Sequence, residues 1–244
     1  MRALLSGFST LLFGIALAMG GLAWAEQAEV NPDFAYFFNG DTPGGWHWVL
    51  ADPGNWYMPL EGNEGVSAGG KLTMTAPDSP EIPGAIKLVW KGTREWASGA
   101  ATIAGRTVDL SAYEHTAELA LALKLDQRTR KPVYVKMACG DECAAEVPVH
   151  HHLKKMNKKG WFALPIPLDC FVAQGAKLKN ITSPFGIITE GKMVLHIAEV
   201  SIRPMAEGDQ GCLPNSETTP DDTAQSNKSR ASENSRAEES KAGQ

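Results

Sequence analysis

The sequence predicts an all-β protein, an antiparallel β-sandwich of the jelly-roll type, within an exported chain that is held by disulfides. Three observations predict it. Apolar and polar residues alternate over many short segments, Gly, Pro, Asn and Asp separate these segments, and four cysteines follow an export signal. Strands do not alternate with long helical patterns and no internal repeat is visible, so a parallel α/β sheet is not expected.

The N-terminus has the pattern of a secretory signal peptide. Arg2 supplies positive charge, residues 3–22 are almost wholly apolar, and Ala23 and Ala25 place small residues at −3 and −1. We expect a signal peptide over residues 1–25 and a periplasmic or secreted mature protein. An uncleaved membrane anchor is the alternative, which the small-residue site disfavours. No cysteine follows the expected cleavage point, so a lipid anchor is not expected.

The remaining chain divides into a foldable part and a polar tail. We expect a sandwich domain over residues 26–212 and a disordered tail over residues 213–244, where Ala is the only apolar side chain from Asn215 onward. Removing residues 1–25 removes Arg2 and no acid, so the net charge falls from −5 to −6. This acidic balance argues against nucleic acid as a partner, and no second apolar stretch is long enough to cross a bilayer.

Alternation is clearest in the middle of the chain. Residues 117–125 place four leucines on one face, at positions 119, 121, 123 and 125, and residues 133–137 repeat the pattern with Tyr134 and Lys136 outward. Residues 193–203 form another strand, in which a β-bulge near Ala198–Glu199 would bring its apolar residues to one face. The other expected elements are strands at 71–75, 85–90, 107–110, 161–166 and 185–189, with a short helix at 169–174.

The four cysteines allow three disulfide pairings. Cys139 and Cys143 flank a short loop in which Gly140 permits a tight bend, and pairing them leaves Cys170 with Cys212. We favour this pattern because exported chains form disulfides; a zinc site is the alternative.

Aromatic residues in irregular segments are the candidate ligand-binding residues. Sugars present flat C–H faces and a rim of hydroxyls, so a sugar site needs exposed aromatic rings beside polar groups. The candidates are Trp46, Trp48, Trp56, Tyr57 and Trp96. In an extended segment Trp46 and Trp48 would face the same way. The alternative is that these rings fill the core, as Trp side chains are heavily buried on average. Trp90 and Trp161 lie within strand patterns and are interpreted as structural.

Two other features predict no specific chemistry. Residues 150–159, His-His-His-Leu-Lys-Lys-Met-Asn-Lys-Lys, are interpreted as a solvated loop, with an anion site or metal capture as alternatives. Oxygen ligands for calcium occur at Asp33, Asp41, Asp52 and Asn55, without a diagnostic spacing. No nucleophile elbow, zinc-protease motif or phosphate loop is present, so we expect no enzyme activity and no cofactor.

A family resemblance follows from a series of short motifs. The series comprises residues 106–111, 137–143, 160–161, 167–171, 183–185 and 189–193, with a weaker match at 87–90. It resembles the galactose-binding-like domain at the C-terminus of ExoP-type exo-β-glucanases, which are family-3 glycoside hydrolases, over most of residues 33–203. The resemblance implies a jelly roll without the catalytic domains, and it supports the cysteine pairing above.

Two functions are therefore expected to compete. The first is a non-catalytic carbohydrate-binding module of the bacterial envelope or secretome, for β-glucan or a related glycan. The second is a protein-interaction or assembly module that docks a separately encoded glycoside hydrolase or envelope partner. A stand-alone hydrolase is a third, less favoured hypothesis.

Overall fold

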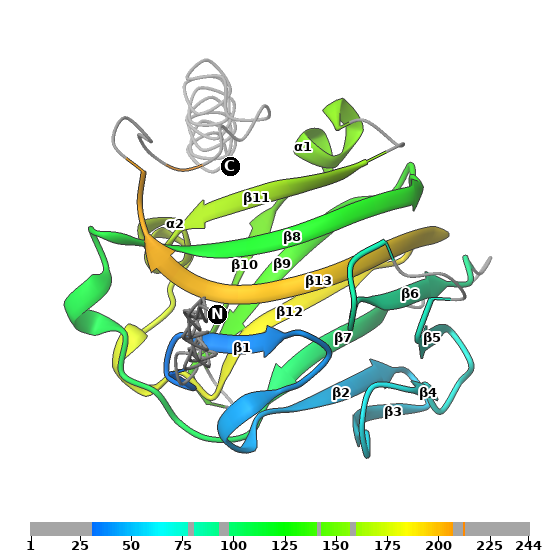
Figure 1. Ribbon diagram of the computed structural model, residues 1–244, viewed down its shortest axis with the longest axis horizontal. Coiled ribbons are helices and arrows are strands. Elements are labelled where there is room, and N and C mark those ends of the chain that lie inside the picture. The colour runs from blue at the N-terminus through cyan, green and yellow to red at the C-terminus, as the bar shows by residue number, and fades with distance from the viewer. Residues whose placement is uncertain are drawn as a thin grey trace, which may run out of the picture.

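The protein folds into two antiparallel β-sheets that pack face to face (Figure 1). The computed structural model describes residues 31–77, 81–92, 98–140, 143–156, 160–206 and 212. The expected signal peptide and polar tail lie outside these residues. Every strand pair in the described part of the chain is antiparallel, so the predicted fold class is confirmed.

The seven-stranded sheet is nearer the viewer in Figure 1. Its strands, in spatial order, are β11 (Trp161–Pro167), β8 (Ala117–Gln127), β13 (Met193–Pro204), β6 (Ile86–Trp90), β5 (Leu72–Thr75) and β4 (Gly65–Val66), while β1 (Ala35–Phe38) also pairs with β13.

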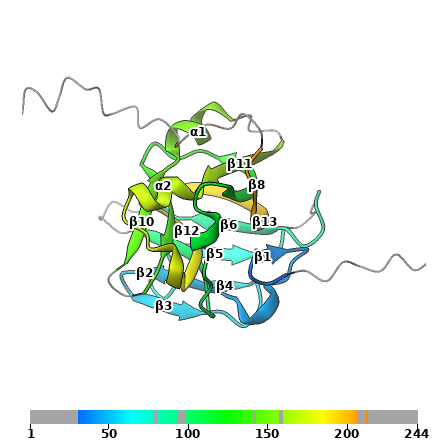
Figure 2. The same ribbon diagram turned by 90° about the vertical axis from the view of Figure 1, so that its left-hand side faces the viewer.

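The six-stranded sheet lies behind it. Its strands, in spatial order, are β10 (Ala144–Pro148), β9 (Val133–Ala138), β12 (Ser183–Thr189), β7 (Gly99–Ala104), β2 (His47–Asp52) and β3 (Asn55–Pro59). The helices are short: α1 (His150–Lys155), α2 (Leu168–Ala173) and the 3-10 turns η1 (Pro43–Gly45), η2 (Ser111–Tyr113) and η3 (Leu178–Asn180). Figure 2 shows α1 and α2 near β10 and β11, away from β2 and β3.

The core lies between the sheets and follows the predicted alternation. The four leucines of β8 at positions 119, 121, 123 and 125 are each at most 1% exposed. In β13 the register shifts between Ile197 and Glu199, which confirms the expected bulge. Because of this extra residue, Val200 and Ile202 return to the buried side that Leu195 and Ile197 occupy.

Two segments differ from the expectation. Residues 107–110 form no strand; Val108 makes one isolated bridge to Ile181, and Leu110 donates its N–H to Leu178. The apolar pattern there reflects burial of two side chains at the edge of the core rather than a sheet ladder. The histidine run begins helix α1 instead of forming a loop, because Leu153 is buried and anchors the turn against the core.

Both expected disulfides are present. Cys139 pairs with Cys143 and Cys170 pairs with Cys212, which leaves none of the four cysteines for a zinc site. The second disulfide fastens residue 212 to α2, so it ties the end of the domain to the sandwich. Disulfides persist in oxidising compartments, which agrees with an extracellular or periplasmic location. Within the described ranges, no helix has the length and apolar composition needed to cross a membrane.

Candidate functional site

Two of the five predicted ligand-binding aromatics are core residues. Trp46 is 3% exposed and its Nε1 donates to the Pro32 carbonyl oxygen at 2.8 Å. Trp48 is 1% exposed and lies edge-to-face with Phe37 and Phe185. Trp46 and Trp48 do point in the same direction, as expected, but both side chains point into the core between the sheets. The expectation that these two rings form a ligand platform is therefore wrong.

Trp56 and Tyr57 are in contrast exposed. They lie on β3, the edge strand of the six-stranded sheet, and their exposed fractions are 61% and 58%. A short edge strand has a partner on one side only, so fewer neighbours cover its side chains. Trp96 lies outside the described residues. These two rings remain the candidates from the sequence prediction.

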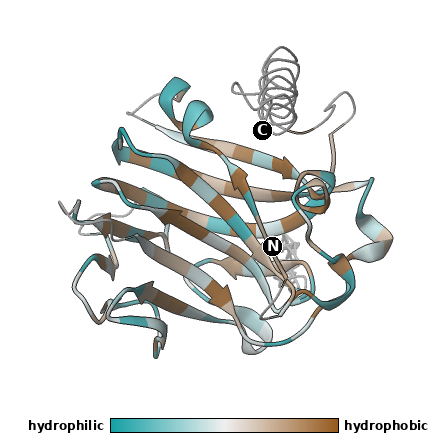
Figure 3. Cartoon of the chain, turned by 180° about the vertical axis from the view of Figure 1, so that it is seen from behind, coloured by the Kyte–Doolittle hydropathy of each residue, from teal (hydrophilic) through white to brown (hydrophobic). Residues whose placement is uncertain are grey.

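The strand registers show which residues share the outward side of the six-stranded sheet. Ile187 pairs with Val135 and Ala101, and all three belong to the core. Because side chains alternate along a strand, their neighbours in sequence point to the opposite side. We call this side the outer face, and it carries residues 47, 49 and 51 of β2, 57 and 59 of β3, 100, 102 and 104 of β7, 186 and 188 of β12, 134 and 136 of β9, and 146 of β10. Figure 3 views the molecule from behind and shows apolar and polar residues alternating along the strands.

Small side chains occupy the middle of the outer face. Gly186 pairs with Thr102, and Ala100 pairs with both Ile188 and Ala51. We call Ala51, Ala100, Thr102 and Gly186 the small-residue strip. A Cβ atom added at Gly186 would lie 3.1 Å from Thr102 Oγ1, so the strip is closely packed even without side-chain bulk there. Ala51 and Gly186 are buried and Ala100 and Thr102 are half-buried, so short side chains line three adjacent strands here.

Larger polar and aromatic side chains flank the strip on both sides. On the β2–β3 side, His47 Nε2 lies 3.3 Å from Tyr57 Oη. On the other side, Tyr134 stands on β9 and the Lys136 Nζ lies 3.8 Å from Glu146 Oε1. Aromatic rings and hydrogen-bonding groups thus border the small-residue strip on both sides.

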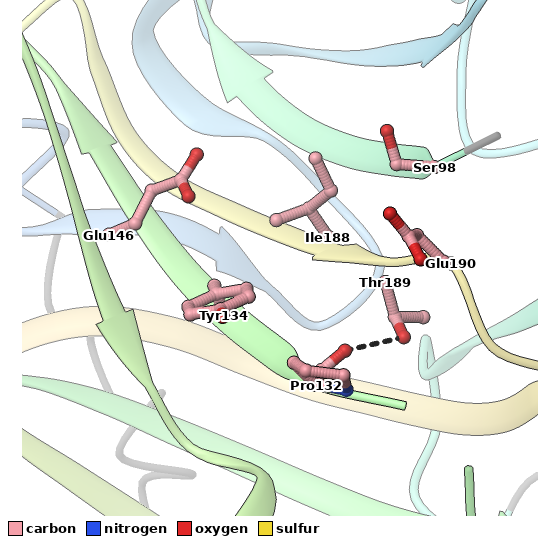
Figure 4. Close-up of a pocket in the computed structure, with 7 residues that line it drawn as sticks. All are labelled: Ser98, Pro132, Tyr134, Glu146, Ile188, Thr189 and Glu190. Carbon is pink, nitrogen blue, oxygen red and sulfur yellow. Dashed lines mark hydrogen bonds between the residues drawn. The ribbon is translucent and has the colours of Figure 1, made fainter. Parts of the chain in front are cut away.

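A pocket of about 250 Å³ opens at one end of this surface. Its lining comes from three strands, β9, β10 and β12, and from residues just outside strand ends: Ser98, Pro132, Tyr134, Glu146, Ile188, Thr189 and Glu190 (Figure 4). Tyr134 and Ile188 are direct cross-strand partners. The polar groups in the lining are two carboxylates and three hydroxyls, while the rest is apolar.

A buried carboxylate supports the edge that carries Trp56 and Tyr57. Asp52, at the end of β2, is 0% exposed and accepts hydrogen bonds from Ser67 Oγ at 2.6 Å and from the Gly54 N–H at 2.8 Å. The Gly69 N–H lies 2.8 and 2.9 Å from its two oxygens. Burial raises the pKa of Asp52, but these hydrogen bonds outweigh it and hold the pKa below its usual value. Asp52 thereby fixes the β2–β3 turn to the loop before β5.

The sequence's candidate metal ligands are engaged elsewhere. Asp33 pairs with Arg106, Asp41 accepts from the Thr42 N–H, and Asn55 accepts from the Tyr57 N–H. Burial and the nearby Lys155 and His151 lower the pKa of His152 in α1. Within the described chain, the residues whose ligand atoms come together are Glu114, His115 and Asp169, where His115 Nδ1 lies 2.8 Å from Asp169 Oδ1.

Much of the outer face was not predicted from the sequence. Trp56 and Tyr57 were chosen because aromatic rings gather in that segment, whereas His47, Glu146 and Glu190 have no distinctive sequence context. Tyr134 did carry a signal, since it is the outward residue between Val133 and Val135.

The fold defines the class: an antiparallel β-sandwich of two packed sheets. A family model described as galactose-binding domain-like, Exop_C, matches residues 45–202. The protein therefore belongs to this galactose-binding-like family, which agrees with the resemblance in the sequence motifs.

Solved structures agree on the fold. The extra C-terminal domain (X) of the exo-1,3/1,4-beta-glucanase ExoP from a Pseudoalteromonas species is similar with a TM-score of 0.58 and 18% identity, covering 74% of this chain and 97% of that domain. The larger structure of the same glucanase is similar with a TM-score of 0.59 and 18% identity, over 78% of this chain. This chain spans only 23% of the length of that glucanase.

More distant similarity includes a family 30 carbohydrate binding module, with a TM-score of 0.46, 13% identity, and coverage of 64% of this chain and 92% of that one. This value is too low to support a functional conclusion. A search of curated proteins finds no match.

Proposed function

We propose that this protein is a non-catalytic carbohydrate-binding module that acts outside the cytoplasm and holds a β-glucan or related glycan on the outer face. The observation that carries the proposal is the small-residue strip bordered by His47 and Tyr57 on one side and Tyr134 on the other. Aromatic rings bind the C–H faces of sugars, and the neighbouring polar groups bind their hydroxyls.

The family supports the class of ligand. The similar domain belongs to a protein named as an exo-1,3/1,4-beta-glucanase, in which it is an extra C-terminal domain. A module that holds a glycan near an enzyme needs an accessible surface and no reacting groups. The sheet that carries this surface is held by antiparallel pairing along its length, so the surface is preformed.

The dimensions of the strip suit an extended chain. Ala100 and Ala104 are four residues apart on β7, so the outer side of this strand is about 13 Å long at a rise near 3.3 Å per residue. An extended glycan lying along the strands would place more than one sugar unit on the outer side of β7. A globular ligand would touch only the larger side chains that border the small-residue strip.

The test uses two matched substitutions in affinity gel electrophoresis with soluble mixed-linkage β-glucan. Ala100→Leu places a bulky side chain in the small-residue strip, and Ala163→Leu makes the same change on the outward side of β11 in the other sheet. We expect the native protein and Ala163→Leu to be retarded alike, and Ala100→Leu to lose at least about tenfold in affinity through steric exclusion.

The controls separate binding from folding. Tyr57→Ala should weaken retardation, and circular dichroism should be unchanged because Tyr57 is 58% exposed. If no β-glucan retards the native protein, or if Ala100→Leu and Ala163→Leu bind equally, the proposed site is wrong.

A second function, docking of a separately encoded glycoside hydrolase or envelope partner, is favoured by a different surface. An apolar pocket of about 340 Å³ is lined by residues that include Phe34, Tyr113 and Ile202. Phe34 and Tyr113 lie edge-to-face at 5.2 Å. Under this function Tyr113→Ala would abolish binding to a purified partner enzyme, whereas Ala100→Leu would not.

A further inference from the structure

The pocket at the end of the outer face is lined by negative charge. Binding of a neutral sugar does not by itself need such charge. Of the seven lining residues within the described ranges, Glu146 and Glu190 carry negative charge and none carries positive charge. Figure 4 shows Glu146 on β10 and Glu190 beyond the end of β12, on opposite sides of Ile188. The lining is therefore apolar in its middle and acidic at its borders.

The two carboxylates are available to a ligand. Among the described residues Glu190 has no hydrogen-bond or ion-pair partner, although it is only partly exposed. Glu146 has a long contact with Lys136, at 3.8 Å, and both side chains are about 40% exposed, with values of 44% and 39%. An ion pair of this length and exposure is weak, so it neutralises little of the charge on Glu146.

The other polar groups of the pocket are hydroxyls. Thr189 Oγ1 donates to the Pro132 carbonyl oxygen at 2.8 Å and so orders the turn before β9 (Figure 4). Tyr134 supplies an aromatic ring, with Ile188 as its cross-strand neighbour. A sugar ring next to Tyr134 would direct its hydroxyls to carboxylate oxygens, which are strong acceptors of O–H donors.

We infer that this pocket selects sugar units by charge: it takes uncharged or amino-bearing units and rejects units that carry a carboxylate or sulfate. Glu146 and Glu190 are the specificity-determining residues. A negatively charged sugar would stand beside two carboxylates, with no cation among the lining residues that the structure describes, and like charges at close range oppose binding. The inference rests on the proposed function, because it concerns the same outer face.

The experiment compares oligosaccharides that differ only in charge. Isothermal titration calorimetry at low salt would use neutral cello- and laminari-oligosaccharides, their counterparts oxidised at C6 to glucuronate, and chitosan oligomers with an ammonium at C2. We expect neutral and amino-bearing oligosaccharides to bind about tenfold or more tighter than the oxidised ones, with a ratio that falls in high salt because ions screen the repulsion.

Two double variants identify the cause of the selectivity. Glu146→Gln/Glu190→Gln keeps the shape of both side chains and removes their charge, so the ratio of neutral to oxidised affinity should fall below about threefold. Glu61→Gln/Glu114→Gln removes the same charge from residues that do not line the pocket and should leave the ratio unchanged.

The outcomes are distinguishable. If the native protein binds oxidised and neutral oligosaccharides equally, or if both double variants change the ratio alike, the charge selectivity is refuted while the proposed function stands. If none of the oligosaccharides binds, the proposed function itself fails, and the inference fails with it.

Discussion

Replacing Asp52 with Asn should destabilise the edge of the sandwich that carries Trp56 and Tyr57. Asp52 is completely buried, and its carboxylate joins the β2–β3 turn, through Gly54, to the loop of residues 67–71. Asn has nearly the same shape, so the substitution creates no cavity. It replaces one acceptor oxygen by an NH₂ group and removes the negative charge.

The magnitude follows from the hydrogen bonds at Asp52 Oδ2. Ser67 Oγ already accepts from the Lys71 and Leu72 N–H groups at 3.1 and 3.0 Å, so its own hydrogen is donated to Asp52. An amide NH₂ at this position would face donors instead of accepting from them. Hydrogen bonds to charged groups contribute ~1.5–3 kcal/mol, and a buried unpaired group costs ~1–3 kcal/mol. We expect a net loss of about 3 kcal/mol, or a fall in Tm of roughly 6–12 °C for a domain of this size.

The assay is denaturant unfolding of the native protein and of Asp52→Asn between pH 3 and pH 7. Because the pKa of Asp52 is lower in the folded state than the unfolded value near 3.9, its ionisation stabilises the fold above about pH 4. This stabilisation is lost as the pH falls through the folded pKa. The difference between the two proteins should therefore be constant near neutral pH and shrink in acid.

Asp41→Asn is the matched control. Asp41 is exposed and its carboxylate accepts one hydrogen bond, from the Thr42 N–H at 2.8 Å, so its loss should change stability by less than about 0.5 kcal/mol. The reasoning is refuted if Asp52→Asn is as stable as Asp41→Asn, or if its deficit is unchanged down to pH 3.

Three further predictions concern the core, the turns and the disulfide, each measured by thermal and denaturant unfolding. Trp48→Ala should cost about 3–5 kcal/mol, while Trp56→Ala should cost less than about 0.5 kcal/mol, because the first ring is buried and the second is 61% exposed; equal losses would contradict this assignment. Gly84→Ala should destabilise the fold far more than Gly62→Ala. Both glycines have positive φ, of 75° and 85°, but a Cβ at Gly84 would meet neighbouring backbone, whereas a Cβ at Gly62 would meet no atom within 4 Å. Similar losses of stability would show that backbone strain alone determines the cost of both substitutions. Cys212→Ser should cost about 4 kcal/mol, as it opens a loop with a sequence separation of 42; native stability in the absence of reductant would show that this crosslink contributes little.

The strand pattern was readable from the sequence because burial of one sheet face imposes a period of two on the chain. The leucines of β8 and the bulge of β13 are both consequences of this rule, and both agree with the structure. The disulfide between Cys139 and Cys143 could also be predicted from the sequence, since a short loop keeps two nearby cysteines close together. Local patterns of this kind depend on neighbours in sequence.

The outer face depended on tertiary structure. Trp48 and Tyr57 are both aromatic residues of adjacent strands, yet one fills the core and the other faces solvent. Their parity along the chain is fixed only when β2 pairs with β7 and β3, and a shift of one residue would exchange the two sides. The sequence could therefore indicate that aromatic residues gather in this segment but not which of them a ligand could reach.

The sequence by itself determined the fold class, the inward residues of the regular strands and the family, because these follow from local alternation and short motifs. Tertiary structure alone decided that residues distant in the chain, such as Tyr57, Tyr134, Glu146 and Glu190, belong to one face. Their proximity arises from the pairing of β10, β9, β12, β7, β2 and β3, and such long-range pairing leaves no periodic signal at any one of these positions.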